Sequence, residues 1–218
     1  MATVAINRIV LAIALPLTVS AGTIAATPPP HGPPWTVVDW PASLSEKPST
    51  GISLGKLRIQ FETTTLEQIR RTMHLGEIAH QGDAAESVSW LCYTIFDPGK
   101  PERIWITSGE MGGNTVVTGI SAETPPHVTP MSDCPLLPKT FQPVSLDVPV
   151  WLGSSAAELH HALGSPSHIG ADWREYDFRS KIVGNGKCEG GYDFGSSLSA
   201  KLRNGKVVAI DAQQVTSC

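Results

Sequence analysis

Cysteine is scarce in this chain, and the first of its 4 cysteines is Cys92. Lipid attachment at the start of an exported chain needs a cysteine directly after the N-terminal apolar run. None stands there, so a lipid anchor at that place is excluded. No two cysteines have the close C-x-x-C spacing of a structural metal site, so we expect no metal bound through these thiols.

The chain also lacks an excess of basic residues, with 16 Lys and Arg against 20 Asp and Glu and a net charge of −4. Proteins that bind nucleic acid normally have a basic excess, so nucleic acid is excluded as the expected partner. After the N-terminal stretch there is no hydrophobic run long enough to cross a membrane, and we predict no membrane span. No residue pattern indicates a cofactor, and we expect none.

The first residues have the layout of a secretory signal peptide. Arg8 precedes an apolar run from Ile9 to Val19, and small residues follow it. This run is too short to span the roughly 30 Å hydrocarbon core of a bilayer. We therefore expect residues 1–26 to be removed by cleavage after Ala26, with cleavage after Ala21 as the alternative, and the protein to be periplasmic or secreted.

An even number of cysteines in an exported chain usually forms disulfides. Four cysteines allow three pairings. We favour Cys92 with Cys134 and Cys188 with Cys218, because each bond then lies within its own part of the chain.

Two proline-rich stretches divide the sequence. Residues 27–55 begin with "TPPPHGPP" and indicate an extended tether, although its Trp35 and Trp40 are able to dock on the folded part or on a partner. Residues 124–143 indicate a linker. The stretches leave two candidate units, residues 56–123 and 144–218.

The two units show the same order of signals: a capped helix, a turn, a strand with a Trp-x-x-Tyr core, and a closing hairpin. The strands are "SWLCYTI" and "DWREYDF", and Asn204-Gly205 between two alternating runs predicts a tight hairpin turn. This order predicts an α+β fold of two tandem units, each a short helical layer packed on an antiparallel β-sheet. The expected helix caps are Thr64 or Thr65 with Glu67 or Gln68, and Ser154 or Ser155 with Glu158.

The second unit, "LGSSAAELHHALGSPS … WREYDF … LRNGKVVAI", resembles the domain of the SmpA/OmlA outer-membrane lipoproteins and one repeat of the β-lactamase inhibitor protein family. In those families a glycine, a Ser or Thr cap, Glu and an aliphatic residue open a helix that ends at Leu-Gly-x-Pro. The first unit lacks that ending and has "LGEI" instead. The resemblance implies a helical layer on an antiparallel sheet whose open face binds another protein. The matching residues are Gly153, Ser155, Glu158, Leu159, Leu163, Gly164 and Pro166.

Side chains alternate between the two faces of a strand, so residue parity predicts which residues lie on the open face. Tryptophans surrounded by charged residues are typical of the energetic centres of protein interfaces. The alternative is that these tryptophans pack against the proline-rich linker or the other unit, because most tryptophans are largely buried. The predicted open face carries Trp90, Trp105, Trp173, Glu175, Asp177, Lys201 and Arg203.

Two features suggest catalysis, and each has a simpler explanation. "GISLG" matches the G-x-S-x-G motif, but Ser53 lacks the preceding strand and following helix that a nucleophile elbow requires. Glu175 and Asp177 would lie about 6 to 7 Å apart on one strand face, which is compatible with a glycosidase. A charged strand edge exposed to solvent is the simpler explanation of these acids. We expect no enzymatic activity and no catalytic residue.

These observations predict an exported protein-binding module. We expect it to act as an inhibitor or immunity protein against a periplasmic or secreted enzyme, such as a cell-wall hydrolase. The alternatives are a small periplasmic hydrolase and an accessory protein of envelope assembly. The sequence leaves the oligomeric state open.

Overall fold

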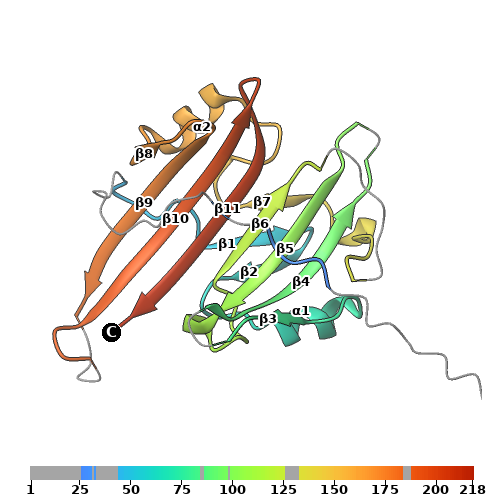
Figure 1. Ribbon diagram of the computed structural model, residues 1–218, viewed down its shortest axis with the longest axis horizontal. Coiled ribbons are helices and arrows are strands. Elements are labelled where there is room, and N and C mark those ends of the chain that lie inside the picture. Colours follow the sequence, from blue (N-terminus) through green and yellow to red (C-terminus); the bar gives the residue numbers. More distant parts are fainter. Residues whose placement is uncertain are drawn as a thin grey trace, which may run out of the picture.

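The computed structural model describes residues 26–30, 32, 44–83, 86–97, 99–125, 133–183 and 188–218. Within these residues, eleven strands form two antiparallel sheets, and the two α-helices are only eight residues long each (Figure 1). The expected α+β fold of two tandem helix-on-sheet units is therefore wrong. The fold is mostly β, and neither helix is long enough to form a layer over a sheet.

The larger sheet is continuous across both halves of the chain. Its β6 and β11 pair side by side, with Ala122 opposite Ile210, so the expected units share one hydrogen-bonded sheet. Without this pairing, each half of the sheet would end in an edge strand with unpaired backbone N–H and C=O groups. In spatial order, its strands are β3 (Ala79–Gln81), β4 (Val88–Ile95), β5 (Glu102–Gly109), β6 (Gly119–Glu123), β11 (Lys206–Ser217), β10 (Tyr192–Arg203), β9 (Trp173–Ile182) and β8 (His168–Ile169).

A smaller sheet of three strands and the two helices pack on one face of the larger sheet. Its β1 places Ile52 and Leu54 in the main hydrophobic core beside Leu91 and Ile104 of the larger sheet. We call this side of the larger sheet the core face. The elements are β1 (Gly51–Leu54), β2 (Leu57–Gln60), β7 (Val144–Leu146), α1 (Leu66–Met73), α2 (Ala156–Leu163) and two short 3-10 helices, η2 (Glu110–Gly112) and η3 (Lys139–Phe141).

The folded body begins inside the stretch that was expected to be a tether. β1 lies within residues 27–55, and the residues before it are also held. The Ser49 hydroxyl donates a 2.6 Å hydrogen bond to Asp147, and the Thr50 amide donates one of 2.9 Å to the same carboxylate. Trp35, Trp40 and residues 1–25 of the expected signal peptide lie outside the described residues.

Several local predictions are confirmed. Thr65 caps α1 with Gln68 in a capping box, and Ser155 caps α2 with Glu158 in the same arrangement. The β10–β11 hairpin turns at Asn204-Gly205, and both residues have the positive φ angle that such a tight turn requires.

Both favoured disulfides are present. Cys92 is bonded to Cys134, and Cys188 is bonded to Cys218. The first bond ties the middle of the expected linker to β4, where Cys134 is fully buried and the Leu137 amide donates to the Thr94 carbonyl. Residues 133–143 are therefore part of the folded body. In the described ranges, no helix is long and apolar enough to cross a membrane.

Candidate binding surface

The strand parity read from the sequence is confirmed. On β4, Leu91 and Tyr93 join the main core, and Trp90 and Cys92 belong to a separate cluster on the opposite side of the sheet. We call this second side the polar face, and it is turned toward the viewer in Figure 1. The strand registers place one row of side chains across it, namely Cys92, Trp105, Ser121, Asp211, Ser199 and Glu175.

The three tryptophans of the expected open face are buried: Trp90 is 2% exposed, Trp105 1% and Trp173 7%. Ala26 packs on the cluster that contains Trp90 and Trp105, and the Trp105 Nε1 donates a 3.1 Å hydrogen bond to the Thr27 carbonyl. Cys134 of the expected linker belongs to the same cluster, which agrees with the alternative that the linker packs on these tryptophans. The contacts of Ala26 and Thr27 were not expected. The polar face is not an open binding surface at these positions.

The charged residues expected on this face differ in their surroundings. The Lys201 ammonium lies 3.3 Å from an Asp172 oxygen and 5.7 Å from the centre of the Trp173 ring. Arg203 is exposed at the end of β10, beyond a register shift between Lys201 and Leu202. Four charged residues were predicted for the open face, and only Arg203 among them is exposed. Glu175 and Asp177 are buried, and Lys201 is half-buried.

The buried acids are held by neighbouring side chains. The Ser199 hydroxyl donates a hydrogen bond to Glu175 Oε2, and the Ser121 hydroxyl donates one of 2.6 Å to Asp211 Oδ2. Arg179 Nε lies 2.7 Å from Asp177 Oδ2. Serine and carboxylate groups therefore alternate across four adjacent strands.

Burial raises the pKa of Glu175 to about 7, against the opposing effect of the Ser199 hydrogen bond and with a further rise from nearby Asp177 and Asp211. Burial also raises the pKa of Asp177, although Arg179 opposes this, and the pKa of Asp211. Carboxyl groups with a shifted pKa are common at catalytic sites. Here, however, the cavity that Asp211 lines holds only about 90 Å³ and the hollow that Asp177 lines about 210 Å³, whereas small-molecule sites usually offer about 300 to 1,000 Å³.

Replacing Glu175 with glutamine is expected to stabilise the protein at alkaline pH. A carboxyl whose pKa is raised by folding contributes stability below its unfolded pKa of about 4.5 and loses that contribution as the pH rises through about 7. The shift corresponds to roughly 3 kcal/mol. Glu175→Gln should therefore exceed the wild type in free energy of unfolding by up to about that amount at pH 8.

Urea denaturation at pH 4 and pH 8 measures this difference. The exposed Glu189→Gln variant is the control and should match the wild type at both pH values. A Glu175→Gln variant that is less stable than the wild type at pH 8 would show that the ionised carboxylate stabilises this row.

Ser53 does not lie in a nucleophile elbow. It is in β1, between two strands of the smaller sheet, and Arg58 Nη1 lies 3.5 Å from its hydroxyl. Among the described residues, no group of three or more His, Cys, Asp and Glu side chains is arranged to hold a metal ion.

A different part of the larger sheet is open to solvent. The far ends of β9, β10 and β11 project from the body of the molecule (Figure 1). The Cys188–Cys218 disulfide joins the segment between β9 and β10 to the C-terminal residue, which directly follows β11. At this end of β9, Ile182 is 44% exposed, and the residue after it, Val183, is 96% exposed. We call residues 179–183, 192–195 and 215–218 the hairpin end.

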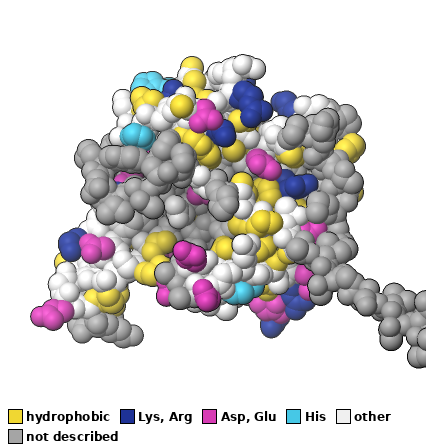
Figure 2. Space-filling model, viewed as in Figure 1, with side chains coloured by type: hydrophobic (Ala, Val, Ile, Leu, Met, Phe, Trp, Pro, Cys, Tyr) yellow, Lys and Arg dark blue, Asp and Glu magenta, His cyan; other side chains and the backbone are white. Residues whose placement is uncertain are grey.

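A hollow of about 590 Å³ lies on the hairpin end, and a second of about 210 Å³ adjoins it. The two share Arg179, Gly195 and Val215, so they form one groove along the polar face. Gly195 has no side chain to fill the floor, and no atom lies within 4 Å of where a Cβ would stand. Lys181 and Asp193, whose charged groups are 3.1 Å apart, stand at the rim, and Figure 2 shows charged and hydrophobic side chains together at this end.

Reasoning from the sequence missed this groove, although two signals for it were present. A glycine inside a strand often marks a place where another backbone or a ligand approaches closely, and Gly195 stands in the middle of β10. Ile182 and Val183 are two consecutive apolar residues at the end of an alternating strand pattern, where apolar side chains have little to pack against.

Comparison of the chain with protein-family models, with curated proteins and with solved structures finds no match. The resemblance to the β-lactamase inhibitor protein and SmpA/OmlA families therefore stays a prediction.

Proposed function

We propose that this is an exported protein that binds another protein through its hairpin end, and that it acts as an inhibitor or immunity protein. The proposed partner is a periplasmic or secreted enzyme, such as a cell-wall hydrolase. The observation that carries the proposal is the exposure of Ile182 and Val183 on a strand pair that is tied by a disulfide and bordered by a groove.

Export is supported by the signal-peptide layout of the first residues and by the two disulfides, because disulfides persist in oxidising compartments. Both the periplasm and the external medium are oxidising enough for these two disulfides.

A binding role is supported by the physical character of the hairpin end. Exposed apolar patches that are rimmed by polar residues mark sites of protein interaction. The disulfide fixes the strand ends before a partner arrives, which reduces the entropy lost on association. A stiff projection of this kind suits insertion into the cleft of an enzyme, and this favours the inhibitor over the accessory role in envelope assembly.

The test compares three immobilised proteins in an envelope extract, with bound proteins identified by mass spectrometry. The wild type should retain a protein that the Val183→Asp variant retains at least about tenfold less, because a charge at the centre of an interface is left unpaired. The control is Ile169→Ser, which changes an exposed apolar residue on β8, at the other end of β9, and should retain the partner fully.

All three proteins should have the same melting temperature, since both sites are exposed. Equal capture by the wild type and Val183→Asp would contradict binding through the hairpin end. A captured enzyme is then titrated with the protein, and loss of its activity separates an inhibitor from an assembly factor.

A further inference from the structure

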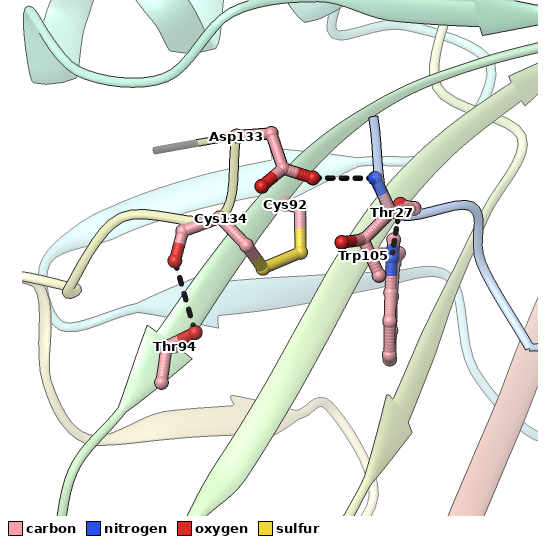
Figure 3. The surroundings of a disulfide bond; sticks show 6 residues. All are labelled: Thr27, Cys92, Thr94, Trp105, Asp133 and Cys134. Atoms are coloured by element: carbon pink, nitrogen blue, oxygen red, sulfur yellow. Dashed lines mark hydrogen bonds between the residues drawn. A yellow bond between two sulfur atoms is a disulfide. The ribbon is translucent and has the colours of Figure 1, made fainter. Parts of the chain in front are cut away.

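The backbone nitrogen of Thr27 donates a hydrogen bond to the Asp133 carboxylate, although 106 positions separate the two residues (Figure 3). On the other side, the Thr27 carbonyl accepts the Trp105 Nε1 hydrogen bond. Thr27 is therefore held at both its nitrogen and its carbonyl oxygen, at the start of the proline-rich stretch that covers the tryptophans.

Asp133 is itself rigidly placed. The next residue, Cys134, is bonded to Cys92, and its carbonyl accepts a 3.0 Å hydrogen bond from the Thr94 hydroxyl. These two attachments fix the carboxylate against β4, where Thr27 meets it.

The carboxylate of Asp133 has unused capacity for a donor. Its Oδ1 atom is buried and has no hydrogen-bond partner among the described residues. Burial alone would raise the pKa of Asp133, but hydrogen bonds from the backbone and side chain of Thr27, together with the Arg103 guanidinium, hold that pKa below its usual range. The group is therefore ionised at neutral pH, and a carboxylate with one buried oxygen left unpartnered is costly.

An amide nitrogen supplies one hydrogen and no charge, whereas a terminal ammonium supplies three hydrogens and a positive charge. Thr27 is also the residue that follows the expected cleavage site at Ala26. We propose that cleavage between Ala26 and Thr27 creates an α-ammonium that forms a half-buried ion pair with Asp133 and fastens the proline-rich stretch over Trp105.

The covalent step is a simple hydrolysis by an export peptidase. Water adds its oxygen to the Ala26 carbonyl carbon, the C–N bond breaks, and the products are the Ala26 carboxylate and the Thr27 amine. That amine has an ordinary pKa of about 8, so it is mostly protonated at neutral pH. Ala26, which touches the Trp90 and Trp105 cluster in the uncut chain, leaves with the leader.

The ion pair forms only after cleavage between Ala26 and Thr27. The attachment of the proline-rich stretch to the polar face therefore depends on that cleavage. In the uncut precursor, Thr27 brings no charge to Asp133, and a chain cut elsewhere has no terminal charge at this point. This inference is independent of the proposed partner, because it concerns the stability of the exported chain alone.

The first test is the N-terminal sequence of the exported protein, which should begin at Thr27. A chain that begins at Gly22, as cleavage after Ala21 would give, or at any other residue would overturn the proposal.

The second test compares the Thr27 chain with the same chain acetylated at its terminal amine. Acetylation removes the charge and changes no side chain, so it should lower the melting temperature by roughly 2 to 4 °C. In the Asp133→Asn variant, acetylation should have no effect, because the partner charge is absent. An acetylated wild type that melts with the unmodified chain would overturn the proposal, and so would an equal loss in the folded Asp133→Asn variant.

If Asp133→Asn does not fold, a chain that keeps Ala25 and Ala26 before Thr27 replaces it. That chain moves the terminal charge two residues away from Asp133 and leaves the rest unchanged. It should melt at the temperature of the acetylated chain, and a melting temperature equal to that of the Thr27 chain would count against the ion pair.

Discussion

Replacing Trp105 with alanine is expected to lower the free energy of unfolding by about 3 to 5 kcal/mol, the usual cost of truncating a buried aromatic side chain. Trp105 is among the largest fully buried side chains, and it contacts the cluster formed by Trp90, Cys92 and Cys134. Truncation also removes its hydrogen bond to the Thr27 carbonyl, which holds the N-terminal stretch on the sheet.

Guanidinium denaturation of the two proteins measures the difference. The control is Phe96→Ala, which truncates an aromatic that is exposed at the end of β4 and should change stability by less than about 0.5 kcal/mol. If Trp105→Ala were as stable as this control, Trp105 would have to be exposed on an open surface. The reason for placing the binding site at the hairpin end would then be lost.

Removing the Cys92–Cys134 disulfide, by replacing both cysteines with alanine, is expected to cost about 4 kcal/mol. The bond closes a loop with a sequence separation of 42 residues, and the loss of loop entropy in the unfolded chain gives this magnitude. The Cys92 side chain is also buried, so alanine there leaves a small cavity in the cluster that holds Trp105.

The matched comparison is the Cys188–Cys218 bond, whose separation of 30 residues gives a slightly smaller entropic effect. Its loss should also release the hairpin end, whereas loss of the first bond should not. Urea denaturation of both double variants tests whether loss of the Cys92–Cys134 bond costs more stability than loss of the Cys188–Cys218 bond. Equal stability of the Cys92/Cys134 variant and the wild type would show that the segment around Cys134 is held without the bond.

Local signals in the sequence predicted local structure well. The two capping boxes and the Asn204-Gly205 turn depend on residues within a few positions of one another, and the structure has them as expected. The face of each strand followed from parity, since a strand alternates its side chains whatever its neighbours are. The disulfide pairing followed from proximity in the chain.

Contacts between distant segments could not be predicted in this way. The pairing of β6 with β11 joins residues about 90 positions apart, and neither strand carries a local mark of its neighbour. β1 has only four residues, "GISL", without a clear alternation, so it was assigned to a tether. Ala26 and Thr27, which cover Trp90 and Trp105, lie where the expected leader meets the proline-rich stretch, and no periodic pattern marks that place.

The position of the binding site is the central claim, and hydrogen–deuterium exchange on the complex with the captured partner tests it most directly. The account predicts slower exchange on binding at residues 179–183 and 192–195, in the hairpin end. It predicts no change at residues 88–95 and 102–109, in the strands that carry the buried Trp90 and Trp105. Protection of those two strands, with unchanged exchange in the hairpin end, would contradict the account.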